Sequence, residues 1–514
     1  MWIPAAALAA LLCALPAAQA VVEPSRLIAV FVVDGLRPDS INPVDTPTLA
    51  RLRAEGAEYV NSHSIFPTVT RLNAATLATG AYPSQHGIVG NSMFVAGVNA
   101  GSPFDTGDYR QLLRLEEIDG RAALAQTLGE ILQRNGRKLV TLSSGTTGNG
   151  FLLNPQARHG AGAAIHGQFD RGTTAAFPRT VSDAVIKRFG SPPAEPDNVG
   201  QMQWTDAVLR DYVLPELRPD VVIDWMGPLD AAQHANGVSA PQAKEALRRI
   251  DESLSRTIAK MQSNSALPLD VIITSDHGFA QHTTGVNVSR ALGDAGLGDA
   301  IASARIVVAS QSQSVLFYVR DREPDLTQRL VRVLQRQPWV DVIFTRGGSA
   351  GHGSVPGTFS LDLVKGSHAS RGADVAISLA WTSNPNPYGV KGTQTINSST
   401  IGRLEGAASG HGGLSPWVVR NTLIVWGPDF KARTRIDAPA SLADLTPTML
   451  AVLGIDHGCA AGCGRALREA LKNGPGSVKT SKRVLRASAD GYRASVQIST
   501  AAGHEYVDTG TRER

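Results

Sequence analysis

The sequence predicts an α/β protein built on a doubly wound, mostly parallel sheet, with an α+β cap domain inserted into it. Short β-branched runs alternate with stretches of helical periodicity from residue 27 to about residue 280. Four runs are continuously apolar, as expected for strands buried on both faces: residues 27–33, 138–144, 221–226 and 271–275. Residues 241–262 carry apolar side chains at helical spacing between the last two strands, which predicts a β-α-β crossover.

The pattern changes after Gly278. Residues 281–404 contain short strands around one helix, and they separate an Asp-His-Gly segment from a Gly-His-Gly-Gly segment. An insertion between two such polar segments is typical of a cap over a functional site. We therefore predict three parts after residue 20: a core of residues 21–280 plus 405–470, a cap of residues 281–404, and a tail of residues 471–514 that forms a β-hairpin.

Composition and the N-terminal segment restrict the class of protein. The 514 residues are 42% hydrophobic and 18% charged, which is typical of a globular protein. The net charge of +4 is small and no long basic run is present, so we expect no nucleic-acid polymer as a partner. Residues 1–20 resemble a signal peptide with an uncharged apolar centre and an Ala-Gln-Ala end. A membrane anchor is the alternative, but the stretch is short for a span, so we expect a secreted or periplasmic protein without a stable anchor.

The cysteines agree with an oxidising compartment. Cys13 lies in the predicted signal peptide, which leaves Cys459 and Cys463. We expect these two to form a small-loop disulfide. A pair of free buried thiols is the alternative, whereas a structural zinc would need more thiolate ligands.

Carboxylate, imidazole and hydroxyl side chains follow several of the predicted strands. In an open α/β sheet, residues just past the carboxyl ends of the strands converge on one rim. Nitrogen and oxygen ligands of this kind, with a hydroxyl among them, predict a two-zinc centre with a nucleophile. The seven candidates are Asp34, Thr70, Asp230, His234, Asp276, His277 and His411.

The candidates divide into two ligand sets. Asp230, His234 and His411 would hold one zinc ion and leave a position open for water or substrate. Asp230 and His234 are spaced i, i+4, which places both on one face of a helical turn. The second zinc ion would take its ligands from the remaining four residues: Asp34, Asp276, His277 and the Thr70 oxygen.

The charges of this centre favour phosphate-ester chemistry. Two zinc ions outweigh the three carboxylates by one positive charge, which favours ionisation of Thr70 and binding of a small phosphate ester. Ionised Thr70 would act as a nucleophile and form a covalent phospho-threonine that water then hydrolyses. Each motif alone is commonly a turn, a cap or a glycine loop. Their joint occurrence, in order and after strands, favours the catalytic interpretation.

The ordered motifs resemble the alkaline phosphatase superfamily, and within it the type I phosphodiesterase/nucleotide pyrophosphatase family. The matching segments are VDGLRPD at 33–39, PTVT at 67–70, TGAYPSQHGIVGN at 79–91, the Asp230/His234 pair, SDHG at 275–278 and GHGG at 410–413. The resemblance covers residues 27–291 and 402–467. It implies that Thr70 is the nucleophile, that two zinc ions take the ligands assigned above, and that the Asn91 amide holds a non-bridging phosphate oxygen.

Two positions depart from the pattern of the family's nucleotide-cleaving members. Those members usually follow the nucleophile with a phenylalanine that stacks on the base, whereas this chain has Arg71. Arg71 would instead steady an anionic or carboxylate-bearing substrate. Trp225 stands where the family has a tyrosine, and we expect its ring to stack on the substrate.

The leading hypothesis is therefore a two-zinc hydrolase of phosphodiester or pyrophosphate bonds. A phosphomonoesterase or a phosphonoacetate-type hydrolase on the same site is the first alternative. A dianionic monoester would favour a third metal, for which the sequence has no evident ligand set, whereas Arg71 favours a monoester. The second alternative is a catalytically silent binding protein on an enzyme fold. That alternative predicts the loss of a ligand or of the nucleophile, yet all seven positions are filled.

Overall fold

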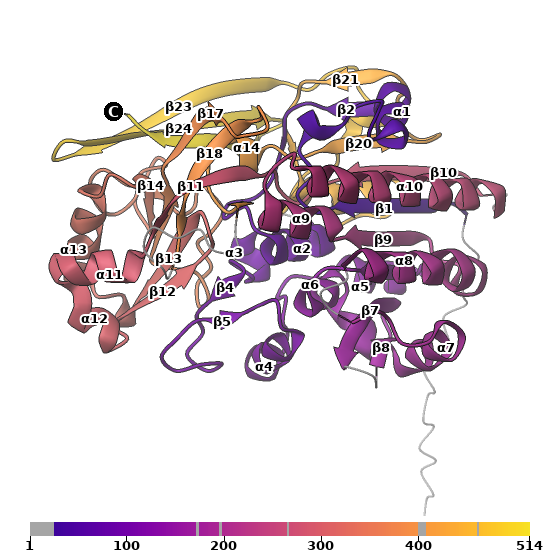
Figure 1. The fold of residues 1–514 in the computed structure, drawn as a ribbon, viewed down its shortest axis with the longest axis horizontal. Coiled ribbons are helices and arrows are strands. Elements are labelled where there is room, and N and C mark those ends of the chain that lie inside the picture. Colours follow the sequence, from indigo (N-terminus) through magenta and orange to yellow (C-terminus); the bar gives the residue numbers. More distant parts are fainter. Residues whose placement is uncertain are drawn as a thin grey trace, which may run out of the picture.

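A nine-stranded sheet forms the centre of the protein (Figure 1). The computed structural model describes residues 25–170, 174–194, 198–264, 267–398, 408–459 and 462–513, so the predicted signal peptide lies outside the described residues. The strands of this sheet, in spatial order, are β21 (Thr434–Ile436), β2 (Ala57–Tyr59), β20 (Leu423–Trp426), β10 (Leu269–Thr274), β1 (Leu27–Val33), β9 (Val221–Met226), β6 (Leu139–Ser143), β7 (Ala163–Asp170) and β8 (Thr174–Phe177).

The middle of the sheet is parallel. β10, β1, β9, β6 and β7 run in one direction, whereas β20 and β8 pair antiparallel to their neighbours β10 and β7. The four continuous apolar runs became β1, β6, β9 and β10, and the predicted crossover helix is α10 (Pro241–Asn264). The predicted α/β class with a mostly parallel sheet is confirmed.

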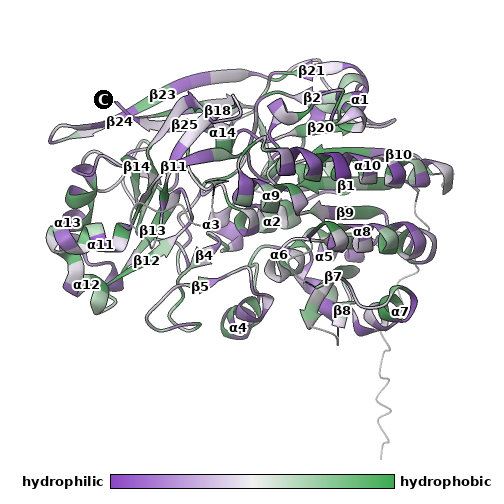
Figure 2. Cartoon of the chain, in the orientation of Figure 1, coloured by the Kyte–Doolittle hydropathy of each residue, from purple (hydrophilic) through white to green (hydrophobic). Residues whose placement is uncertain are grey.

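Both faces of the sheet are buried, which explains why its strands are apolar throughout. In β1, Ile28, Val30 and Val32 belong to one hydrophobic cluster, and the alternating residues between them belong to another. Figure 2 shows the central strands as mostly hydrophobic along their length. The helices that contribute to the two clusters are α1 (Pro47–Glu55), α8 (Asn198–Val208) and α10 on one face, and α2 (Thr70–Thr79), α5 (Leu128–Arg134) and α15 (Leu445–Val452) on the other.

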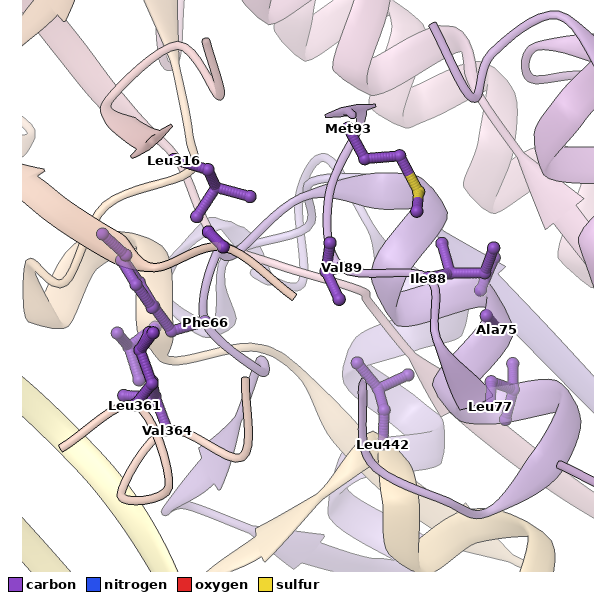
Figure 3. Close-up of a cluster of buried hydrophobic side chains, with 14 of the residues drawn as sticks. Phe66, Ala75, Leu77, Ile88, Val89, Met93, Leu316, Leu361, Val364 and Leu442 are labelled. Carbon is purple, nitrogen blue, oxygen red and sulfur yellow. The ribbon is translucent and has the colours of Figure 1, made fainter. Parts of the chain in front are cut away.

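The chain between β10 and α14 (Pro416–Val419), which includes the predicted insertion, forms two further sheets. One has the order β12 (Ile306–Ser310), β13 (Ser314–Val319), β16 (Val375–Leu379), β14 (Val340–Thr345) and β15 (Phe359–Ser360), and α13 (Pro324–Gln335) packs against β14. The other has the order β17 (Trp381–Pro385), β18 (Lys391–Asn397), β11 (Ala280–Val286) and β19 (Ser409–Gly410). Figure 3 shows Leu316 and Val364 of the insertion in one buried cluster with Phe66 and Ala75 of the core.

The C-terminal residues, for which we expected a hairpin, form three antiparallel strands. These are β23 (Thr480–Ala489), β24 (Tyr492–Ala501) and β25 (His504–Arg512). The sheet contacts both other parts of the chain: the Tyr506 hydroxyl donates to Asp444 of the core, and the Tyr492 hydroxyl donates to the Asp341 carbonyl of the insertion.

Two further findings concern the cysteines and the search for membrane-spanning helices. Cys459 and Cys463 are joined by a disulfide bond, as predicted. Among the helices within the described ranges, none combines the length and the apolar character needed to cross a membrane.

Candidate metal centre

The strand order of the central sheet brings the predicted ligands to one rim. Asp34 directly follows β1, Asp276 and His277 follow the neighbouring β10, and α9 (Pro228–Asn236) after β9 carries the Asp230/His234 pair. These three strands are adjacent and parallel, so their carboxyl ends lie side by side. β11 and β19 pair antiparallel, which carries His411 to the same place from a distant part of the chain.

Asp230, His234 and His411 form one group. Oδ1 of Asp230 lies 3.4 Å from Nε2 of His234 and 3.6 Å from Nε2 of His411, and the two Nε2 atoms are 3.2 Å apart. Ligand atoms bound tetrahedrally to zinc at about 2.0–2.1 Å lie about 3.3 Å from one another. The three distances therefore match the spacing of ligands around a single metal ion.

A second group surrounds His277. Its Nε2 lies 2.9 Å from Oδ2 of Asp276, 3.5 Å from Oδ1 of Asp34 and 3.3 Å from Oγ1 of Thr70. The imidazoles of His277 and His411 are stacked, with centroids 3.5 Å apart, so the two groups adjoin. His277 is also close enough to Asp230 and His411 to share an ion with them. Because its shortest contact is to Asp276, we group it with Asp276 and Asp34.

Backbone carbonyls orient all three imidazoles. Nδ1 of His234 lies 3.0 Å from the Ser409 carbonyl oxygen, Nδ1 of His411 lies 2.8 Å from that of Thr68, and Nδ1 of His277 lies 3.1 Å from that of Gly278. A carbonyl oxygen can only accept a hydrogen bond, so each Nδ1 carries the proton. In the neutral ring each Nε2 then keeps its lone pair, and it is the Nε2 atoms that converge.

The carboxylates of the two groups are arranged to bind a cation. Oδ1 of Asp34, Oδ1 of Asp230 and Oδ2 of Asp276 are buried and have no hydrogen-bond partner among the described residues. Burial raises the pKa of Asp34, and the charges of Asp276 and Asp230 raise it further. Buried carboxylate oxygens without donors are costly unless they bind a cation. The donor set, its spacing and these three oxygens therefore fit divalent metal ions with mixed nitrogen and oxygen ligands.

Trp225 does not have the role that we expected. Its side chain is fully buried in β9, and its indole N–H donates to Oδ2 of Asp34 at 2.9 Å. A ring without exposed surface cannot stack on a substrate, so the predicted stacking role is wrong. Trp225 instead holds one oxygen of Asp34, a candidate metal ligand.

The remaining predicted residues lie around Thr70, the first residue of α2. The Arg71 backbone N–H donates to Oδ1 of Asn91 at 3.0 Å, which ties the Asn91 loop to the first turn of α2. Sequence reasoning missed Gln311, whose Oε1 accepts the Asn91 N–H at 2.7 Å. Gln311 lies between β12 and β13, in the insertion, and no motif marks it.

The chain is similar in sequence to several known proteins. A pyrophosphatase/phosphodiesterase of Schizosaccharomyces pombe, described as uncharacterised, is 23% identical over 254 residues, which cover 49% of this chain and 44% of the relative. Ectonucleotide pyrophosphatase/phosphodiesterase family member 1 of Homo sapiens is 24% identical over 255 residues, covering 49% and 23%. Venom phosphodiesterase 2 of Crotalus adamanteus is 34% identical over 79 residues, covering 15% and 10%. The chain spans less than half the length of each of these relatives.

The family profile covers more of the chain than any of these pairwise matches. The profile of type I phosphodiesterases/nucleotide pyrophosphatases matches residues 28–338 of the 514. This segment holds every candidate ligand except His411. The chain belongs to the type I phosphodiesterase/nucleotide pyrophosphatase family.

Proposed function

We propose that this protein hydrolyses phosphodiester or pyrophosphate bonds of small molecules, with two zinc ions held by the seven predicted residues. The observation that carries the proposal is the convergence of three partnerless carboxylate oxygens and three imidazole Nε2 atoms beside a threonine hydroxyl. Thr70, Asp34 and Asp276 are buried, whereas the side chains of Asp230 and His234 are 21% and 33% exposed. The Asp230/His234 side is therefore the side from which a substrate reaches Thr70.

Thr70 would act as the nucleophile. Bound zinc would supply positive charge that polarises the phosphate ester and favours the ionised hydroxyl. Thr70 begins α2, a helix of 10 residues, whose N-terminal dipole also favours an anionic oxygen. Oγ1 of Thr70 forms a bond to phosphorus as the bond from phosphorus to the leaving oxygen breaks. Water then cleaves the phospho-threonine and returns the proton to Thr70.

Asn91 and the insertion complete the proposed site. Oδ1 of Asn91 accepts the Arg71 N–H, which leaves Nδ2 as the donor to a non-bridging phosphate oxygen. Gln311 of the insertion holds the Asn91 backbone. We therefore infer that residues 281–404 act as a cap over the core. The predicted signal peptide and the disulfide support a secreted or periplasmic location.

Rates on two chromogenic esters test this function. Zinc-loaded protein should hydrolyse bis-p-nitrophenyl phosphate faster than p-nitrophenyl phosphate, and a chelator should abolish both activities. Thr70→Ala should lower turnover by at least about 1,000-fold, whereas Thr70→Ser, which keeps a hydroxyl, should retain part of it. Retention of diester turnover by Thr70→Ala would refute the proposal.

A monoesterase is the second candidate, since Arg71 adds positive charge beside Thr70. A preference of the wild-type protein for p-nitrophenyl phosphate would favour that candidate. Hydrolysis of phosphonoacetate alone would favour a phosphonate hydrolase on the same site.

A further inference from the structure

Arg71 has a side-chain donor without a hydrogen-bond partner in the described part of the chain. It follows Thr70 in the first turn of α2, and its side chain is only 15% exposed. Its Nη2 donates to Oδ1 of Asp105 at 3.1 Å, whereas its buried Nε has no hydrogen-bond partner among the described residues. An unsatisfied buried donor on a charged group is costly, and a guanidinium binds anionic oxygens best through two parallel donors. Asp105 therefore holds the Arg71 guanidinium, and one of its donors remains without a partner among the described residues.

Strand pairing and hydrogen bonds connect Asp105 of the ion pair to the loop that carries Asn91. β4 (Ser92–Met93) follows Asn91 and pairs with β5 (Phe104–Asp105), which sets Ser92 opposite Asp105. The Thr106 N–H and hydroxyl both donate to the Asn91 carbonyl, at 2.9 Å and 2.8 Å. Asp105 thus keeps a fixed position relative to Asn91, and Asn91 in turn binds the backbone of Arg71.

Gly107 leaves room for this pair. Its N–H donates to Oδ1 of Asp105 at 2.7 Å, the same oxygen that accepts from Arg71. A Cβ atom at position 107 would lie 3.0 Å from that oxygen and 3.3 Å from Nη2 of Arg71. A side chain there would crowd the ion pair, so the turn is shaped to hold it.

Arg71 also adjoins the proposed nucleophile. It directly follows Thr70 in the first turn of α2. A substrate with its phosphorus at Thr70 would carry its neighbouring atoms past this guanidinium.

We propose that the Arg71–Asp105 pair selects phosphodiesters or pyrophosphates that carry a second anionic group, a carboxylate or a phosphate, near the scissile phosphorus. The inference rests on the proposed function for the position of the phosphorus. Arg71 would bind the second group through donors that Asp105 does not use, and Asp105 would hold the guanidinium plane in place. An uncharged substituent at the same position would leave the donors that Asp105 does not use without an anionic partner.

Three matched diesters test the proposal: p-nitrophenyl phenyl phosphate, and analogues with a carboxylate or a phosphate on the phenyl ring. We expect wild-type kcat/KM to be about 10-fold or more higher for at least one anionic ester than for the uncharged one. Arg71→Gln should bring this ratio close to one, and Arg71→Lys should retain part of it because charge remains without the planar fork. The two anionic esters distinguish a carboxylate site from a phosphate site.

A control variant and a binding measurement separate the role of Arg71 from effects on catalysis. Arg114→Gln changes an exposed arginine of α4 (Tyr109–Asp119) and should leave the ratio and both rates unchanged. Calorimetry with hydrolysis-resistant phosphonate analogues of the same esters should show the same ratio in Kd. No preference for either anionic compound, or a preference that Arg71→Gln retains, would overturn the inference. Absence of hydrolysis with a retained Kd ratio would contradict the proposed function and leave this inference standing.

Discussion

The indole N–H of Trp225 donates to Oδ2 of Asp34 at 2.9 Å, and both side chains are almost completely buried. This bond occupies one oxygen of Asp34. The other, Oδ1, lies 3.5 Å from Nε2 of His277 and has no hydrogen-bond partner within the described ranges. Asp276 is divided in the same way: its Oδ1 accepts the Gly35 N–H at 3.1 Å and its Oδ2 faces His277. Protein donors thus hold one oxygen of each carboxylate and direct the other to the candidate metal site.

Replacing Trp225 by phenylalanine tests this arrangement. The variant keeps an aromatic ring in β9 but removes the donor to Asp34, so we expect zinc affinity to fall by about 10–100-fold. The matched control is Trp204→Phe on α8, because the Trp204 indole N–H has no partner among the described residues. Competition with a chromogenic chelator measures both affinities. Equal zinc affinity in Trp225→Phe and wild type would contradict the supporting role of this bond.

Gln311→Ala tests the link between the insertion and the loop that carries Asn91. Gln311 is 2% exposed and accepts the backbone N–H groups of Asn91 and Ser92 at 2.7 Å and 3.3 Å. Losing both bonds should let the Asn91 amide move, so we expect kcat/KM for the diester to fall by about 10–100-fold. Zinc content should stay the same, because Gln311 touches no ligand. The exposed Gln328→Ala on α13 should have wild-type kinetics. A loss of zinc together with activity would assign Gln311 a different role.

The sequence predicted the parts of the site that follow directly from strand order. Asp34, Asp276 and the Asp230/His234 pair all come just after buried apolar strands, and parallel strands place such residues on one rim. His411 was predicted from its motif, although its position depends on the pairing of β11 with β19.

What the sequence could not predict depends on contacts between distant segments. Gln311 and Asp105 stand in no motif, and each acts through a loop that another part of the chain holds. The predicted stacking role of Trp225 failed because a sequence pattern identifies an aromatic residue but not the direction of its side chain, which is buried. The C-terminal tail has three strands where a hairpin was predicted, and its sheet contacts the core through Tyr506 and the insertion through Tyr492, which are partners distant in sequence.

A buried acidic pair beneath the central sheet predicts a pH-dependent effect on stability. Both oxygens of Asp224 in β9 are buried and lack hydrogen-bond partners among the described residues. Burial raises the pKa of Asp224 and the charge of Asp206 raises it further, while burial raises the pKa of Asp206 to about 6. The folded protein therefore holds these protons more tightly than the unfolded chain. Their contribution to stability is present at low pH and is lost as the pH rises through the folded pKa values.

Asp224→Asn should remove this loss. We expect its free energy of unfolding to exceed that of the wild type by about 1–3 kcal/mol at pH 8, with the difference shrinking as the pH falls towards about 4. Urea unfolding at several pH values measures it, and comparison at equal pH cancels any linkage to metal binding. Asp183→Asn, an exposed carboxylate on α7 (Arg179–Phe189), should show no such trend. A variant that is less stable at pH 8 than at pH 5, relative to wild type, would refute the account.

Zinc titration of the metal-free protein, followed by the rate on bis-p-nitrophenyl phosphate, tests the central claim most directly. The two adjoining groups around Asp230 and His277 predict that the rate rises until about two zinc ions are bound per chain and then stays constant. Metal content of the same samples, measured by atomic emission, should follow the same curve. Full diester turnover without zinc, or a maximal rate at one ion per chain, would contradict a two-metal centre.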